Sequence, residues 1–195
     1  MTAQAPEKSD FAVEAAREQA LVARARQGDH AAFREIVERY EGLVAATVVG
    51  MLGPGAEAED VGQQVFIKLY EALHQYRGEG GLAPYLTRIA VNQSLNALDK
   101  RRRLRRRFLS RDEDEACVPD PPVGGEPEIH GRERAALVRR AIDALPDKHK
   151  SVVVLRMIDG YTTQETADLL GIPLGTVLSR LARAQGRLRD LLAGL

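Results

Sequence analysis

Two short segments near the C-terminal end of the sequence carry the side chains best suited to bind a nucleic acid. Residues 163–170 and 174–183 have the apolar spacing of two short helices, and Gly171 lies where the turn between them needs a permissive backbone. We expect Thr163 to cap the first helix and Pro173 to begin the second. Polar and basic side chains share one face of the second helix, namely Thr176, Ser179, Arg180 and Arg183. This arrangement is typical of a helix-turn-helix, whose second helix enters the DNA major groove. The alternative, a helical hairpin inside a core, has no use for such a polar face.

No cluster of residues in the sequence predicts the chemistry of an enzyme. The histidines are scattered, and none lies at triad or ligand spacing from a partner: they are His30, His74, His130 and His149. The single cysteine, Cys117, excludes an internal disulfide, and no Cys/His spacing typical of a metal site occurs. We therefore expect a protein that is not an enzyme, with no catalytic residues, no metal and no cofactor.

The elements that must position the candidate residues begin with a series of helices in the first half of the chain. Apolar positions recur at helical spacing over residues 18–52, 56–76 and 84–103. Asp29 is a candidate N-cap between the first two helices, and the run Gly53-Pro54-Gly55 ends the second. Residues 1–16 are expected to form a loose tail.

The second half predicts a separate helical domain. Residues 111–128 are rich in Asp, Glu, Pro and Gly, which favours a flexible linker. Helical patterns resume at residues 132–144 and 148–158, ahead of the helix-turn-helix. No strand-like alternation occurs, so the fold class is all-α. We expect two small helical domains at residues 18–107 and 132–195, joined by a flexible linker at residues 108–131.

Composition supports a helical protein with segregated charge. The 195 residues are 44% hydrophobic but only 5% aromatic, which suits small helical cores. The 28 Lys and Arg residues balance 28 Asp and Glu residues, yet basic side chains concentrate at residues 100–107 and 180–189 and acidic ones at residues 112–115. The N-terminus lacks the apolar run of a signal peptide, and no stretch is long enough to cross a membrane. A cytoplasmic location is therefore expected.

Four stretches, in this order, resemble the extracytoplasmic-function (ECF) group of the sigma-70 family, the small promoter-recognition subunits of bacterial RNA polymerase. They are residues 58–66 (AEDVGQQVF), residues 76–79 with 85–92 (YRGE and YLTRIAVN), residues 144–160, and residues 171–181 (GIPLGTVLSRL). The resemblance implies sigma region 2 in the first domain, which binds core polymerase and recognises and melts the −10 element. It implies sigma region 4 in the second, whose helix-turn-helix at residues 163–182 reads the −35 element. The chain departs from the usual pattern at Pro84, Tyr85 and Leu178, where most members have Thr, Trp and Lys or Arg.

The resemblance assigns −10 binding and melting to the region that follows residue 76. The residues implied are Arg77, Gly78, Glu79, Tyr85, Arg88, Asn92 and Asn96. Capture of an open strand suits this set, because aromatic faces stack on unpaired bases and amides read base edges. The glycine-rich run at residues 77–81 lets the backbone approach a base that has left the stack. The alternative places Tyr85 in the core and leaves Asn92 an ordinary surface residue.

The resemblance also implies a polymerase-docking surface and a −35 surface. Docking onto a coiled coil of the largest polymerase subunits would use Asp60, Gln63, Gln64 and Phe66, although an ordinary amphipathic helix could show the same pattern. Contact with the −35 element would use Thr163, Gln164, Gly175, Thr176, Ser179, Arg180 and Arg183.

The expected partners are core RNA polymerase, promoter DNA and an anti-sigma factor, which in this family is often membrane-anchored; no small-molecule substrate is expected. A stand-alone helix-turn-helix transcriptional repressor is the main alternative. A repressor would explain the second domain but would leave the first without a role. Repressors of this type usually dimerise to read paired half-sites, and the sequence shows no obvious dimer helix. A purely structural helical adaptor ranks last, because it leaves the promoter-binding face unused.

Overall fold

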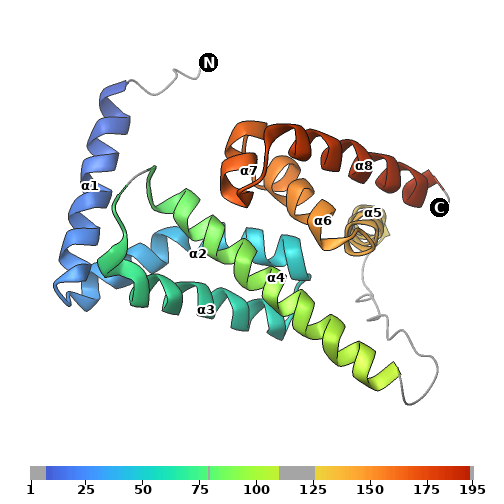
Figure 1. The fold of residues 1–195 in the computed structure, drawn as a ribbon, viewed down its shortest axis with the longest axis horizontal. Coiled ribbons are helices and arrows are strands. Elements are labelled where there is room, and N and C mark those ends of the chain that lie inside the picture. Colours follow the sequence, from blue (N-terminus) through green and yellow to red (C-terminus); the bar gives the residue numbers. More distant parts are fainter. Residues whose placement is uncertain (1–7, 79, 110–125, 194–195) are drawn as a thin grey trace.

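The computed structural model describes residues 8–78, 80–109 and 126–193, which form helices joined by short turns (Figure 1). No strand occurs within these ranges, which confirms the all-α prediction. The helices in chain order are α1 (Lys8–Arg26), α2 (His30–Leu52), α3 (Ala56–Ala72), a 3-10 turn η1 (Leu73–Gln75), α4 (Leu82–Leu109), α5 (Glu126–Asp143), α6 (Asp147–Val153), a π-helical turn η2 (Val154–Ile158), α7 (Thr163–Leu170) and α8 (Leu174–Ala193).

The four helices α1–α4 enclose the larger core, because each turns an apolar stripe inward. Its largest fully buried side chains are Ile36, Met51, Leu69, Leu82 and Leu86. Asp29 caps α2 as expected, since its carboxylate accepts bonds of 3.0 Å from the backbone amides of Ala31 and Ala32. Those amides, together with the Arg24 guanidinium at 2.7 Å, lower the pKa of the Asp29 carboxyl.

The helices α5–α8 surround two smaller apolar clusters. One joins Leu145, Val153 and Ala184, and the other joins Val152, Ala167 and Val177. The first cluster ties α6 to α8, and the second ties α6 to both α7 and α8, so α6 lies at the centre of this domain.

Several helix ends differ from the sequence-based expectation. The chain is already helical at Lys8, so residues 8–16 are not a loose tail. Their Ala, Glu and Lys residues favour a helix, and the Glu14 carboxylate pairs with Arg39 of α2. On either side of the expected linker, α4 continues to Leu109 and α5 begins at Glu126, six residues before the expected start. Glu79, Cys117 and the acidic run at residues 112–115 lie outside the described residues, so the exact domain limits stay a prediction.

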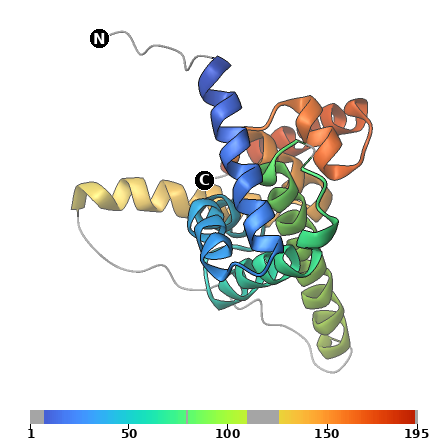
Figure 2. The same ribbon diagram turned by 90° about the vertical axis from the view of Figure 1, so that its left-hand side faces the viewer.

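The two helical groups lie against each other. Both views of the ribbon show α6 and α7 beside α4 (Figures 1 and 2). Val154 of η2 is fully buried in the core of the first group. No helix in the described part of the chain is both long and apolar enough to cross a membrane.

Candidate nucleic-acid interface

The helix-turn-helix begins with a cap one residue earlier than expected. Thr162, not Thr163, caps α7: its hydroxyl accepts a bond from the Glu165 amide at 3.2 Å, and the Glu165 carboxylate accepts one from the Thr162 amide at 2.7 Å. This reciprocal pair is a capping box, and it leaves Thr163 as the first helical residue. The Thr162 amide also lowers the pKa of the Glu165 carboxyl.

The turn follows the expected pattern, and the second helix begins at Leu174 as expected. It continues to Ala193, however, ten residues beyond the expected end at Arg183. Gly171 adopts the left-handed conformation (φ 61°, ψ 38°) and its amide bonds to the Ala167 carbonyl, which ends α7. The Pro173 carbonyl accepts the amide of Thr176 at 2.8 Å, so α8 begins directly after the proline. Val177 of α8 is fully buried against α6 and α7, so the opposite, polar face of α8 points outward.

The candidate −35 residues differ in their exposure to solvent. Four are exposed, namely Gln164, Gly175, Ser179 and Arg183, and three are partly buried, namely Thr163, Thr176 and Arg180. Two are held locally, because the Ser179 hydroxyl donates to the Thr176 carbonyl at 3.0 Å and the Gln164 amide donates to the Asp168 carboxylate at 3.0 Å. Arg180 also lines a pocket that it shares with Leu95 and Arg102 of α4.

The candidate −10 residues divide into two environments. Arg88, Asn92 and Asn96 are exposed and follow each other at four-residue steps, so they share one face of α4. Tyr85 is half-buried at the edge of the first core, and its ring lies 5.0 Å from the ring of Tyr76. The loop before α4 carries exposed Arg77 and three glycines with positive φ, Gly78, Gly80 and Gly81. Tyr85 is therefore anchored by packing, whereas the amides of Asn92 and Asn96 are exposed. The Arg88 guanidinium on the same face donates to the Asp168 carbonyl of α7 at 3.2 Å.

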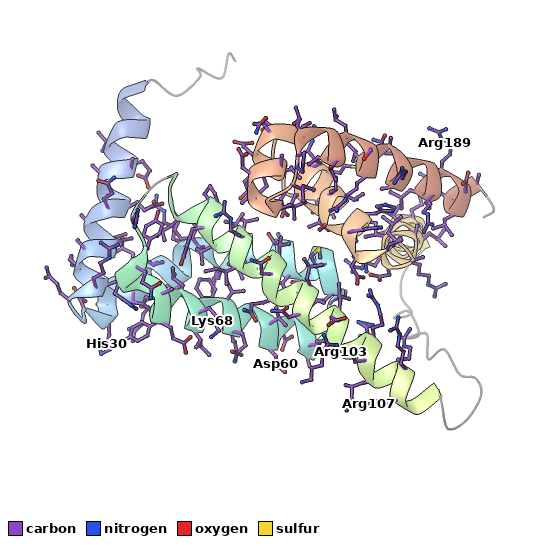
Figure 3. The ribbon with its side chains drawn as sticks, in the orientation of Figure 1. His30, Asp60, Lys68, Arg103, Arg107 and Arg189 are labelled. Atoms are coloured by element: carbon purple, nitrogen blue, oxygen red, sulfur yellow. The ribbon has the colours of Figure 1, made fainter. Side chains whose placement is uncertain are left out.

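The candidate polymerase-docking residues all lie on α3. Asp60, Gln63 and Gln64 are exposed, and Phe66 is half-buried against the core. Figure 3 shows Asp60 and Lys68 of this helix on the side of the molecule away from α7 and α8.

The sequence reasoning missed two further residues on α3. Ile67 and Tyr70 are 45% and 48% exposed, which is unusual for large apolar side chains. Their positions relative to the buried Val65 and Leu69 could have revealed this, because residues one or two positions from a buried one on a helix face elsewhere. Apolar and polar exposed side chains together give α3 the composition of a protein-binding surface.

The basic end of α4 projects beyond the packed helices. Arg103 and Arg107 lie along it (Figure 3). Some of its charges are paired, since Arg103 lies 2.6 Å from Asp99 and Arg101 lies 3.5 Å from Glu57. All side chains from residue 100 to residue 107 are exposed, so this end can contact phosphate groups.

Two buried basic residues lie on α6. His149 is buried, and neither ring nitrogen has a hydrogen-bond partner. Burial, followed by the positive charges of Arg187, Lys148, Arg183 and Arg180, lowers the pKa of the His149 imidazole. Lys150 is 4% exposed and bonds to the Asp143 carboxylate at 3.3 Å; burial nevertheless lowers the pKa of its ammonium group.

No group of His, Cys, Asp and Glu that could hold a metal ion occurs among the described residues. What the geometry offers is two polar surfaces, on α4 and α8, and a mixed apolar and polar surface on α3. None of the three holds a set of side chains arranged for covalent chemistry.

Comparison with protein families gives two matches in chain order. Sigma-70 region 2 matches residues 36–104, and sigma-70 region 4 matches residues 135–188. The first match contains α3 and most of α4, and the second contains the helix-turn-helix.

Curated relatives match along nearly the whole chain. The ECF RNA polymerase sigma-E factor of Escherichia coli strain K12 is 36% identical over 176 residues, which cover 86% of this chain and 90% of the relative. The factor of the same description from Haemophilus influenzae is 34% identical over 176 residues, covering 86% and 91%.

Solved structures share the fold. CnrH in complex with the cytosolic domain of CnrY has a TM-score of 0.64 at 23% identity, covering 91% of this chain and 97% of that one. The sigma factor RpoE in complex with the anti-sigma factor NepR, from Bartonella quintana, also has a TM-score of 0.64, at 19% identity, covering 83% and 96%.

Proposed function

This chain belongs to the sigma-70 family, as an ECF sigma factor homologous to sigma-E. From that premise we propose which surface binds core polymerase and which surfaces bind the two promoter elements. The first domain docks on core RNA polymerase through α3 and reads and opens the −10 element through α4. The second reads the −35 element through α8. The chain itself is a non-enzymatic initiation factor, so the polymerase performs the chemistry.

The observation that carries this proposal is the presence of two polar helix faces on two different domains. Arg88, Asn92 and Asn96 share one face of α4, while Ser179 and Arg183 share the outer face of α8. A repressor that reads one half-site per subunit needs only the second of these faces. Two faces joined through one chain fit a protein that reads two separated elements of the same promoter.

The −10 surface combines stacking with polar contacts. The Tyr85 ring supports an unpaired base at the edge of the domain, and the amides of Asn92 and Asn96 bond to base edges. Arg77 and Arg88 hold phosphates, and the backbone at Gly78 follows the displaced strand. We assign Glu79 to the same surface from the family resemblance. The basic end of α4 adds sequence-independent affinity for the flanking duplex.

The docking surface on α3 joins polar and apolar contacts. We assign Asp60, Gln63, Gln64 and Phe66 to it, and the exposed Ile67 and Tyr70 extend it. Aromatic and aliphatic anchors surrounded by polar groups are the usual centre of a protein–protein interface.

The −35 surface uses the N-terminal half of α8 and the start of α7. Arg180 and Arg183 supply base or phosphate contacts, and Thr176 and Ser179 supply hydroxyl groups. Thr163, Gln164 and Gly175 lie at the two helix starts, where backbone amides approach phosphates.

We assign sigma region 2 to residues 18–107 and sigma region 4 to residues 132–195. An anti-sigma factor is the proposed inhibitor, because the similar RpoE structure is such a complex. The chain would act in the cytoplasm, where its polymerase works.

A gel-shift assay with a promoter fragment tests this function against the repressor alternative. The chain alone should give no specific shift, and the chain with core polymerase should give a complex that survives competitor DNA. A specific shift by the chain alone, unchanged when core polymerase is added, would favour the repressor.

A further inference from the structure

We propose that α1 positions the −10 surface, and that Glu18 of α1 is the positioning residue that holds the loop before α4 in the conformation that meets the −10 element. Figures 1 and 2 show α1 alongside this loop, which links η1 to α4. The loop carries Arg77 and Gly78, and the first turn of α4 carries Tyr85. The inference deepens the proposed function and rests on its assignment of the −10 surface to the loop and α4.

The Glu18 carboxylate joins three segments of the first domain. One of its oxygens accepts the backbone amide of Leu82 at 2.9 Å, and the other accepts the hydroxyl of Tyr40 on α2. A Cβ added at Gly81 would lie 3.6 Å from the first of these oxygens, so the carboxylate also lies against the last residue of the loop. Both oxygens of a side chain on α1 are thus bonded, one to the start of α4 and one to α2.

The Leu82 amide needs an acceptor from outside its own helix. Leu82 is the first residue of α4 and is completely buried, and the first amides of a helix have no partner within the helix. A carboxylate at this end also interacts favourably with the helix dipole. Glu18, which lies 64 positions earlier in the chain, supplies both the acceptor and the charge. The bond therefore helps to fix where α4 begins, and with it the backbone that carries Tyr85.

Tyr40 holds the Glu18 carboxylate in place. Burial, followed by the hydrogen bond to Glu18, raises the pKa of the Tyr40 hydroxyl, so this group remains a donor at neutral pH. Burial, followed by the charge of Glu18, also raises the pKa of Tyr76 to about 12. Because Tyr76 directly precedes Arg77, the Glu18 charge acts at the start of the loop as well as at its end.

A second residue of α1 holds the segment before the loop. The Arg26 guanidinium donates to the Leu73 carbonyl of η1 at 2.8 Å. Arg26 lies eight residues after Glu18, so the two side chains belong to one stripe of α1, with the buried Leu21 and Val22 between them. Helix α1 therefore holds the chain on both sides of the loop.

The loop depends on outside anchors because its own sequence is permissive. Gly78, Gly80 and Gly81 have positive φ, a conformation that glycine adopts without strain but does not favour over others. Such a loop lets the backbone approach a base closely, yet it does not select one conformation by itself. Anchors on both sides restrict the loop, so a base that does not fit it binds less well. Loss of an anchor should therefore weaken discrimination between −10 sequences.

Helix α1 offers a matched control one turn from Glu18. Glu14 also links α1 to α2, but its carboxylate pairs with Arg39 rather than with the loop. Glu14→Ala and Glu18→Ala thus remove the same side chain from the same helix, and only the second removes the acceptor of the Leu82 amide. Tyr40→Phe is an independent variant that keeps the ring and removes the hydroxyl bonded to Glu18. Glu18→Gln is the conservative variant, because it retains an acceptor oxygen.

The experiment measures base discrimination by run-off transcription with the full chain and core polymerase. For each variant, the transcript from a mapped promoter is divided by the transcript from versions with single substitutions in the −10 element. Glu18→Ala should lower this ratio about fivefold or more relative to Glu14→Ala, which is the scale on which one base pair is discriminated. Tyr40→Phe should lower the ratio less, and Glu18→Gln should stay near the wild-type value.

A merely structural role for Glu18 would lower transcription from all templates alike and leave the ratio unchanged. Equal ratios for Glu18→Ala and Glu14→Ala would therefore overturn the proposal. If thermal unfolding shows that Glu18→Ala has lost its fold, Tyr40→Phe decides the question, and a wild-type ratio for that variant overturns the proposal.

Failure of this inference is distinct from failure of the proposed function. A wild-type chain whose transcription ignores every −10 substitution overturns the −10 surface itself. Discrimination that is present in the wild type and survives Glu18→Ala overturns only the positioning role of Glu18.

Discussion

At the scale of single residues, substitutions of Arg180 and Arg183 test the assignment of the −35 surface. Arg180→Ala should weaken promoter use, because loss of one good base or phosphate contact costs roughly 1–3 kcal/mol. Arg183→Ala should act in the same direction. Transcription from a promoter with an intact −35 element measures the loss, and the same promoter without that element should respond little.

Arg189→Ala is the matched control, since Arg189 lies on the same helix toward its far end (Figure 3). Full transcription by both Arg180→Ala and Arg183→Ala would show that the recognition face is misassigned.

His149 predicts a pH dependence of stability. Its imidazole is buried without partners and its pKa is lowered, so folding favours the neutral form. The stability that depends on neutral His149 is complete above the usual pKa of about 6.5 and is lost as the pH falls below it, because the unfolded chain takes up the proton first. His149→Leu should flatten the fall in the free energy of unfolding between pH 7.5 and pH 5.5, as measured in urea.

Identical pH slopes for the wild type and His149→Leu would contradict this assignment. Because the substitution also removes two unpartnered nitrogens, it should not lower stability at pH 7.5.

At the scale of elements, the start of α7 depends on one threonine of an adjacent pair. Thr162→Ala should destabilise the second domain by about 1 kcal/mol, because it removes the side-chain acceptor for the Glu165 amide. Thr163→Ala should have a smaller effect, since Thr163 is already inside the helix. Thermal unfolding of the two variants provides the comparison, and equal losses would argue against the capping box.

Helix α4, to which we assign melting of the −10 element, gives a second prediction at this scale. Tyr85→Ala should lose the permanganate footprint of unpaired thymines on duplex promoter and recover activity on a pre-melted template, because base stacking on an aromatic ring contributes roughly 1–3 kcal/mol. Tyr76→Leu disturbs the same ring contact from the buried side and should retain the footprint. Equal loss on both templates would show that Tyr85 is only structural.

Most helices could be predicted from the sequence, and the helix ends that were predicted wrongly have identifiable structural causes. Apolar periodicity predicted α2, α3 and α4, and Gly171 marked the turn of the helix-turn-helix. The cap of α7 was wrongly placed at Thr163, although Thr162 followed by Glu165 at the third position is the usual capping-box spacing. The first turns of α1 were missed, because their stabilising partner, Arg39, lies on another helix.

At the scale of the whole molecule, the sequence predicted two helical domains but not their contact. Thr47 and Asp159 are 112 positions apart, and neither residue type signals a bond to the other. Gly50 lies inside α2 and carries no turn signal. The structure alone shows that Val154 packs so closely against it that an added Cβ would lie 2.8 Å from a Val154 methyl carbon. Contacts of this kind depend on tertiary packing, which periodicity does not encode.

The central claim is that this chain directs core polymerase to a promoter through two surfaces on two domains. Run-off transcription with purified chain and core polymerase tests it most directly, on a mapped promoter and on versions that lack the −10 or the −35 element. We expect a transcript of defined length from the intact promoter, none from core polymerase or the chain alone, and a strong loss when either element is removed. No transcript from the intact promoter with core polymerase of the same organism, or one indifferent to both elements, would contradict the account.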